Sequence, residues 1–189
     1  MEAIPLTIPS LTPKGFVELC QANQDLNLER DAAGEVILMS PTFPWTGQQN
    51  FSLYVQLGIW IDRTGLGIGF DSSTGFTLPN GAVRSPDVSW VSNEHWRRLT
   101  ESQKKEEFSP LAPDFVVELR SKSDSLQKLQ SKMVEYRENG VKLGWLIDSG
   151  NKRVEIYRPS LDVEVLTSPT NLSGENILPG FVLNLEKIW

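Results

Sequence analysis

Apolar positions in this chain recur at helical spacing in some stretches and on alternate residues in others. Residues 12–23 predict a short helix, with Thr12 as its N-cap and Pro13 at its first position. In residues 26–41, the alternate positions Leu26 and Leu28, and then Val36 and Leu38, flank the turn-forming segment DAAG. This alternation is typical of a β-hairpin.

Two longer stretches have the spacing of amphipathic helices. Residues 45–65 and 123–140 each run for several turns and end at a glycine, a residue that often terminates helices. In the second stretch, Asp124 and Gln127 fit the capping-box pattern. The stripes predicted to face the core are Phe51, Tyr54, Leu57 and Ile61 in the first helix, and Leu126, Leu129, Met133 and Tyr136 in the second.

Five further stretches predict strands, and these are residues 67–81, 85–91, 114–120, 144–149 and 153–159. The PNG segment at 79–81 is a hairpin signal, and the charged residues 92–110 predict short surface helices. The strand–helix–strand step over 114–148 favours one parallel pair in an otherwise mixed sheet. The order of elements therefore predicts an α/β or α+β fold with a central sheet flanked by helices.

Length, charge and cysteine content narrow the class of protein. The 189 residues suit a single domain with a C-terminal extension over residues 160–189, of which residues 179–189 are expected to pack onto the domain. With a net charge of −6 the chain is a poor general binder of polyanions, so a role with nucleic acid depends on a local basic patch or on metal ions. A single cysteine, Cys20, favours a reducing compartment. No apolar run is long enough for a membrane, and the N-terminus lacks signal-peptide features, so we expect a cytoplasmic protein.

Two carboxylates lie at the ends of predicted strands. Glu118 is near the end of strand 114–120, and because side chains alternate along a strand it shares a face with Arg120. Asp87 follows a proline at the start of strand 85–91. If these strands pair, Asp87 and Glu118 lie side by side, and adjacent carboxylates repel each other unless a cation separates them. Such hard oxygen ligands suit Mg²⁺.

Three basic residues are candidates to assist this pair. Arg120 can stabilise charge but cannot act as a base, since arginine stays protonated. Lys122 lies in the following loop, and Lys132 falls at the border of the second helix's apolar stripe, where its ammonium can turn toward the site. Taken singly, Asp87 also fits a turn after proline, and Glu118 with Arg120 also fits a simple ion pair. The one histidine lies in the charged excursion, which argues against serine–histidine or cysteine–histidine catalysis.

Several of these segments occur together in the order found in one protein family. FDSSTGFTLPNGAVRSPDVSWV, then PDFVVELRSKSDSLQKLQSKMVEYRENGVKLGWLID, and VEIYRP closely resemble the restriction-endonuclease family that is expanded in cyanobacteria, a branch of the PD-(D/E)XK nuclease superfamily. The resemblance covers residues 12–160 approximately. It implies a restriction-endonuclease-like core over residues 26–160 or so, with a mixed sheet flanked by helices, preceded by the N-terminal helix 12–23.

The resemblance also implies roles for individual residues. The family's motif aspartate falls on Asp87 and its motif glutamate on Glu118. The superfamily's lysine position, two residues after the glutamate, holds Arg120, whereas relatives carry a lysine on the next helix in a K-x-x-x-Y pattern that Lys132 and Tyr136 match. The residues implied in catalysis are Asp87, Glu118, Lys132 and Arg120.

Metal ligands and activity follow from the same resemblance. Glu29 and Glu35 in the first hairpin match acidic positions of the family, and either can complete a metal shell; we assign Asp87, Glu118 and Glu35 to Mg²⁺, with Mn²⁺ as a possible substitute. The implied activity is metal-dependent hydrolysis of DNA phosphodiester bonds, which a homodimer with two sites performs most easily on a duplex. One alternative is a nucleic-acid-binding or regulatory module with the same fold and little or no catalysis. Another is a structural protein whose carboxylates form ordinary ion pairs.

Overall fold

The computed structural model describes residues 11–189, so the expectation about a signal peptide falls largely on residues 1–10 and lies outside the described residues. The helices are α1 (Pro13–Ala22), α2 (Pro44–Thr64), α3 (Asn93–Arg97), α4 (Glu101–Lys105), α5 (Leu126–Glu138) and the 3-10 turns η1 (Ser149–Asn151) and η2 (Leu185–Lys187). The strands are β1 (Leu28–Arg30), β2 (Val36–Leu38), β3 (Gly67–Asp71), β4 (Phe76–Thr77), β5 (Val83–Arg84), β6 (Val88–Ser92), β7 (Phe115–Leu119), β8 (Leu143–Asp148), β9 (Arg153–Tyr157), β10 (Glu164–Thr167), β11 (Asn171–Ser173) and β12 (Val182–Asn184).

Capping residues set the ends of the helices. The hydroxyl of Thr12 accepts a hydrogen bond from the Gly15 N–H, which confirms the predicted N-cap of α1. Gly65 ends α2 with a φ of 60°, a conformation that glycine adopts without strain. The predicted capping box of α5 is wrong, because Ser125 caps the helix and the Asp124 carboxylate instead accepts from the Ser121 N–H.

A six-stranded sheet in the order β10-β9-β8-β7-β6-β3 forms the centre of the fold. Its β7 and β8 are parallel and are joined through α5, whereas every other neighbouring pair in this sheet is antiparallel. The predicted mixed sheet with one parallel pair is therefore confirmed. The crossover helix is what makes the parallel pairing possible, since a short turn cannot return the chain to the same end.

A smaller sheet in the order β2-β1-β5-β4 lies beside the first and contains the predicted N-terminal hairpin. The segment 67–81, predicted as one strand, instead divides between the two sheets as β3 and β4. The division occurs where the Asp71 carboxylate accepts hydrogen bonds from the backbone and hydroxyl groups of Ser73 and from the Thr74 hydroxyl. These local bonds favour a turn over a continued strand.

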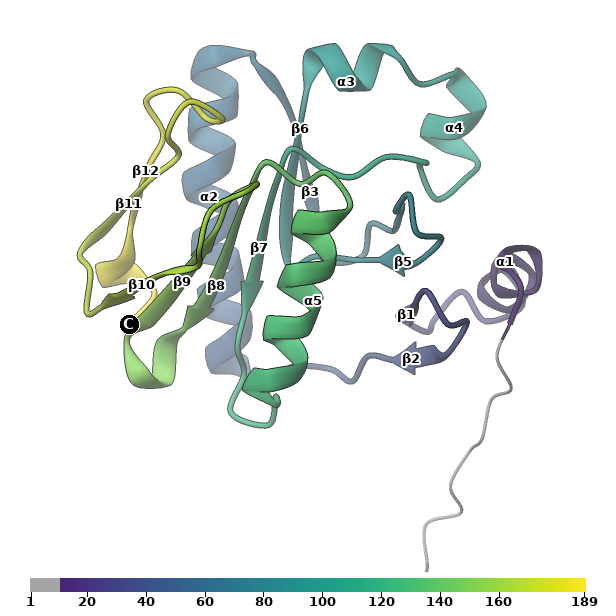
Figure 1. Ribbon diagram of the computed structural model, residues 1–189, viewed down its shortest axis with the longest axis horizontal. Coiled ribbons are helices and arrows are strands. Elements are labelled where there is room, and N and C mark those ends of the chain that lie inside the picture. The colour runs from purple at the N-terminus through teal and green to yellow at the C-terminus, as the bar shows by residue number, and fades with distance from the viewer. Residues whose placement is uncertain (1–10) are drawn as a thin grey trace, which may run out of the picture.

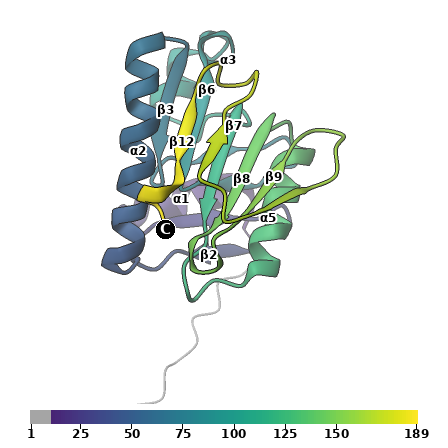
Figure 2. The same ribbon diagram turned by 90° about the vertical axis from the view of Figure 1, so that its left-hand side faces the viewer.

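Helices cover the two faces of the central sheet. Helix α5 packs on one face and α2 on the other, together with the β11–β12 hairpin (Figures 1 and 2). Odd-numbered residues of β7 point toward α2, and even-numbered residues point toward α5, because side chains alternate along the strand. The face under α5 also carries Glu118 and Glu155, so two buried carboxylates lie among the apolar side chains of this layer.

The face of α2 that packs against the sheet differs from the predicted stripe. Leu53, Leu57 and Trp60 are buried, whereas Phe51 is 68% exposed. Both sets of residues repeat at helical spacing, and residues 36–61 contain no charged side chain that would mark the solvent face. Periodicity alone therefore could not identify the buried side of this helix.

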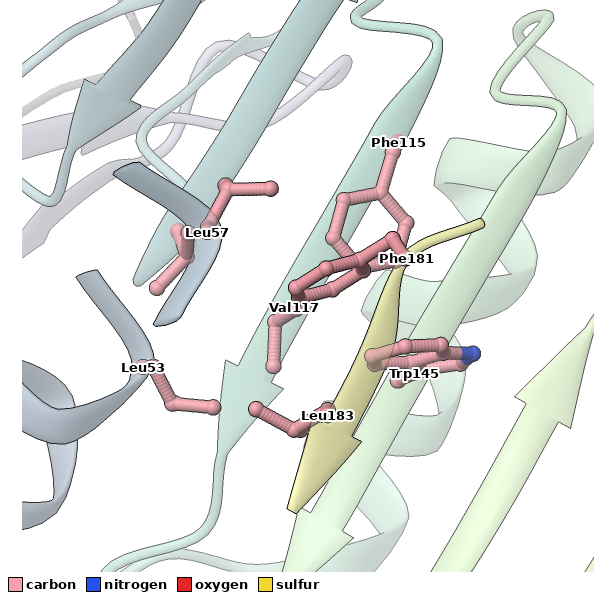
Figure 3. Close-up of a pocket in the computed structure, with 8 residues that line it drawn as sticks. Leu53, Leu57, Phe115, Val117, Trp145, Phe181 and Leu183 are labelled. Atoms are coloured by element: carbon pink, nitrogen blue, oxygen red, sulfur yellow. The ribbon is translucent and has the colours of Figure 1, made fainter. Parts of the chain in front are cut away.

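The C-terminal segment completes the core, as expected for residues 179–189. Figure 3 shows Phe181, just before β12, and Leu183 of β12 pointing at Trp145 of β8 and at the apolar side chains of α2 and β7. The cavity left among these side chains measures about 10 Å³, which is too small for a ligand. The Trp60 indole N–H donates to the Pro179 carbonyl at 3.1 Å, which fixes this segment to α2. Across residues 11–189, no helix has both the length and the apolar character needed to span a bilayer.

Candidate active site

Pairing of β6 with β7 brings the two predicted carboxylates together. Val88 lies opposite Val117 in this antiparallel pair, so Asp87, just before β6, lies next to Glu118. The Leu119 N–H donates to Oδ2 of Asp87 at 2.7 Å, which fixes the aspartate at the end of β7. Tyr54 of α2 donates its hydroxyl proton to the Asp87 carbonyl at 2.7 Å and supports the same segment from the other side.

Helix α5 supplies a lysine and a tyrosine to this position. The Lys132 Nζ lies 2.8 Å from Oε1 of Glu118, and the Tyr136 hydroxyl donates to the same oxygen at 3.0 Å. Residues four apart lie on the same face of a helix, which explains why these two side chains reach one carboxylate. The structure therefore brings Asp87, Glu118 and Lys132 into one cluster.

A third carboxylate, Glu29 of β1, comes from the small sheet. Its Oε1 lies 2.9 Å from the Lys132 Nζ and accepts from the Ser85 N–H at 2.8 Å, and its Oε2 lies 3.2 Å from a guanidinium nitrogen of Arg84. Arg84 also contacts Glu135 of α5 at 2.6 Å. Sequence reasoning left Glu29 and Glu35 as alternatives and did not consider Arg84, because no local pattern indicates that β1 lies against α5.

Two of the residues implied by the resemblance lie outside the cluster. Glu35 is exposed at the hairpin turn, two positions beyond the level of Glu29, so the structure does not bring it into the cluster. Arg120 turns to the neighbouring strand and contacts Asp148 at 2.6 Å, so the alternative of a Glu118–Arg120 ion pair is also wrong. Lys122 is exposed in the loop before α5.

The arrangement agrees with a family assignment that covers almost all of the chain. A model of the family Uma2, described as "Putative restriction endonuclease", matches residues 13–186. The chain belongs to the Uma2 family. Among curated proteins, none matches the sequence of this family member.

A solved structure has the same fold as this Uma2 member. It is the crystal structure of "a putative nuclease belonging to DUF820" from Anabaena variabilis, which matches with a TM-score of 0.78 over 94% of this chain and 97% of its own. The two sequences are 19% identical. At this identity the match establishes the shared architecture, in agreement with the predicted restriction-endonuclease-like class.

The electrostatics of the Uma2 site are dominated by buried negative charge. Burial raises the pKa of Glu118 to about 7, and the charges of Asp87 and Glu29 add to this effect, whereas Lys132 opposes it. Burial also raises the pKa of Asp87, although the Leu119 N–H and Lys132 favour its ionised form. The positive charges in the cluster therefore do not fully balance its carboxylates.

In Lys132 and Glu29, unlike in Glu118 and Asp87, the neighbouring charges outweigh burial and favour the ionised form. Burial alone would deprotonate Lys132, but the carboxylates of Glu118 and Glu29 raise its pKa above the ordinary value. Burial likewise opposes ionisation of Glu29, yet Lys132, Arg84 and the Ser85 N–H together lower its pKa. Lys132 is therefore a permanent cation near neutral pH, and Glu29 is its permanent counter-ion.

The donor set of Asp87 and Glu118 fits a hard divalent cation. Oδ1 of Asp87 and Oε2 of Glu118 accept no hydrogen bond within residues 11–189, whereas both oxygens of Glu29 have partners. In this described part of the chain no three carboxylate, histidine or cysteine side chains gather as a metal-binding group. Mg²⁺ usually takes one or two carboxylates and keeps several waters, so two free carboxylate oxygens are sufficient.

Proposed function

We propose that this protein is a Mg²⁺-dependent endonuclease that hydrolyses phosphodiester bonds of DNA through the Asp87, Glu118 and Lys132 cluster. The observation that carries the proposal is the buried Lys132 ammonium, held between Glu29 and Glu118, with Asp87 on the other side of Glu118 in the neighbouring strand register. The description of the Uma2 family, "Putative restriction endonuclease", supports the same reaction class. The expected order of residues in the PD-(D/E)XK superfamily, with the lysine moved to the following helix, fits this geometry.

Asp87 and Glu118 would hold the metal through their free oxygens, Oδ1 and Oε2. When bound there, Mg²⁺ would lower the pKa of an attacking water and neutralise charge on the scissile phosphate. The two carboxylates are already held in place without the metal, because the Leu119 N–H binds Oδ2 of Asp87 and the Tyr136 hydroxyl binds Oε1 of Glu118. Little rearrangement is then needed on binding.

Lys132 would stabilise charge and would not accept a proton. An ammonium has three donors, and two point at the carboxylates of Glu29 and Glu118, which leaves one N–H for a water or a phosphate oxygen. Since its pKa is raised, Lys132 stays protonated throughout the reaction. Its contribution is the electrostatic stabilisation of negative charge that develops on the phosphate.

Arg120, to which the resemblance assigns a supporting part, would act differently. Its guanidinium contacts the Asp148 carboxylate and the Asp124 carbonyl, which holds the loop between β7 and α5. We infer that it positions the start of α5, and through that helix Lys132. This is a positioning role and needs no contact with the substrate.

The proposal is tested by incubating supercoiled plasmid, single-stranded DNA and RNA with the full chain and Mg²⁺ or Mn²⁺. Wild type is compared with Glu118→Gln, Lys132→Met and a matched control, Lys142→Met, which removes a lysine paired with Asp114 near the opposite end of β7. We expect metal-dependent DNA cleavage that both site variants abolish and the control retains.

Other outcomes would separate the alternatives. Cleavage that survives in Lys132→Met would refute the role of this lysine. Metal and DNA binding without cleavage of any substrate by wild type would instead favour a regulatory, DNA-binding module, which the displaced lysine also fits. Cleavage of RNA without cleavage of DNA would show that the substrate is RNA and would refute the proposed DNA specificity.

A further inference from the structure

The outer surface of α2 is apolar although it is exposed. Residues 36–61 contain no charged side chain in a chain of which 22% is charged, so this segment lacks the charges that keep most surfaces of the protein hydrated. Phe51, Val55 and Ile59 are 68%, 41% and 48% exposed. A contiguous exposed apolar face of this kind marks an interaction surface more often than single scattered residues do.

The three side chains form one ridge. They are spaced four residues apart, so they lie in a row along the helix. Interlocking of two such rows is the commonest way in which helices pack in globular proteins. Gly58 lies next to the ridge, and a Cβ at this position would meet no atom within 4 Å, so another backbone can approach closely there.

A groove of about 330 Å³ runs beside the ridge, between α2 and β3. Its lining residues include Tyr54, Gly58, Ile61, Gly69 and Phe70. The groove thus lies mainly along the C-terminal half of α2, whereas Phe51 projects from the N-terminal half. Phe51 and Gly58 are seven residues apart, a separation of about 10 Å along the helix.

We propose that this surface of α2 binds a second copy of the chain about a two-fold axis near the middle of the helix. Such an axis reverses the direction of α2, so Phe51 of each copy faces the partner's groove at Gly58 and Ile61. The same patch then serves both copies, which is the defining property of an isologous dimer. A protruding aromatic and a groove on one face are what this symmetry requires.

The charges around the face disfavour other occupants. Asp62 and Asp71 line the groove and would repel a phosphate backbone. An anionic lipid surface attracts helices with basic polar faces, and α2 carries one basic residue, Arg63 in its last turn. A copy of the same chain presents an uncharged apolar ridge to the groove, so it meets no such repulsion and needs no basic face.

The ridge supplies part of the area that a dimer needs. Phe51, Val55 and Ile59 are 68%, 41% and 48% exposed. At such exposures these side chains offer roughly 200–300 Å² together. This is about a third of the approximately 800 Å² that each partner buries in a standard interface, before the groove walls are added.

The test is sedimentation equilibrium of the full chain from about 1 to about 100 µM, the range of moderate dimer affinities. We expect wild type to reach twice the chain mass of 21.2 kDa. Phe51→Glu, which removes the protruding side chain, and Gly58→Gln, which fills the groove, should each weaken dimerisation at least tenfold. The matched control is Leu161→Glu, which places the same charge at an exposed leucine before β10.

The variants keep their fold in this design, because Phe51 and Leu161 are exposed and a side chain at Gly58 enters open space. Far-ultraviolet circular dichroism verifies this for each variant. A wild type that stays monomeric over the whole range overturns the proposal, and so does a dimer that both Phe51→Glu and Gly58→Gln retain. The readout is molecular mass, so the result does not depend on nuclease activity.

Discussion

Two buried carboxylates near the ends of β7 have opposite electrostatic environments. Asp114 lies just before the strand and is 1% exposed, and Glu118 lies near its end and is 4% exposed. Burial opposes ionisation of Asp114, but Lys142 at 2.7 Å, the Ser92 N–H and His95 together lower its pKa. The pKa of Glu118 is instead raised to about 7.

The difference lies in the neighbours and not in the burial. Asp114 is one carboxylate between the Lys142 ammonium, the His95 ring and the Ser92 N–H, so its negative charge is locally compensated. Glu118 shares one lysine with Glu29 and lies beside Asp87. A folded protein retains such excess negative charge at a cost in stability, and a bound cation removes that cost. The comparison distinguishes a structural ion pair from a candidate metal site on the same strand.

The largest expected effect comes from removing Lys132, and removing Lys142 provides the comparison. Lys132→Met should lower the free energy of unfolding by about 3–5 kcal/mol, because it leaves buried carboxylates without their cation. Lys142→Met should lower it by about 1 kcal/mol or less, since the Lys142 side chain is 44% exposed and screened by solvent. Urea denaturation at neutral pH measures both, and equal losses would show that the two ends of β7 do not differ.

The pH dependence of stability should differ between the two carboxylates. The folded pKa of Glu118 is above its ordinary value of 4.5, so its contribution is most favourable below that value and is lost as the pH rises through about 7. Wild type should lose on the order of 1–3 kcal/mol between roughly pH 5 and pH 8. In Glu118→Gln this loss should be much smaller.

Asp114 provides the internal control for that measurement. Its folded pKa is lowered, so its contribution is present above its ordinary value of 3.8 and is lost as the pH falls through the folded pKa. Asp114→Asn should therefore alter the acid limb of the stability profile and leave the limb near pH 7 intact. A loss near pH 7 that disappears in Asp114→Asn and persists in Glu118→Gln would contradict the comparison.

Magnesium should act on one end of β7 only. Mg²⁺ in about hundredfold excess over its dissociation constant should stabilise wild type by about 2.7 kcal/mol. The gain should be larger near pH 8 than near pH 6, because protons compete for Glu118 at the lower pH. Thermal denaturation with and without Mg²⁺ measures this, and we expect Asp114→Asn to keep the gain and Asp87→Asn to lose it.

The smallest effect should come from the turn glutamate of the first hairpin. Glu35→Gln should change the free energy of unfolding by less than about 0.5 kcal/mol, because the side chain is exposed. Magnesium stabilisation should also be unaltered. Glu29→Gln, at the buried position on the same hairpin, should weaken both stability and DNA cleavage, because Lys132 and Arg84 lose a charged partner. Isothermal titration with Mg²⁺ measures this, and weaker Mg²⁺ binding by Glu35→Gln than by wild type would contradict the prediction.

Local patterns were sufficient for most elements. The alternation in 114–120, the apolar stripe of 123–140 and the turn residues of the hairpins predict the sheet, the crossover helix and the parallel pair, because these depend on neighbours in sequence. The placement of Asp87 beside Glu118 followed once the two strands were assumed to pair, since register fixes which side chains are adjacent.

Long-range packing decided the rest of the cluster. The choice of Glu29 over Glu35 depends on how the small sheet lies against α5, and Arg120 turns to Asp148 because β8 is its neighbour. The buried side of α2 was equally undetermined, as both of its faces are apolar. The sequence by itself determined the elements and the identity of the acidic and basic candidates. Only the tertiary structure decided which charged side chains are buried together, because that depends on contacts between segments far apart in the chain.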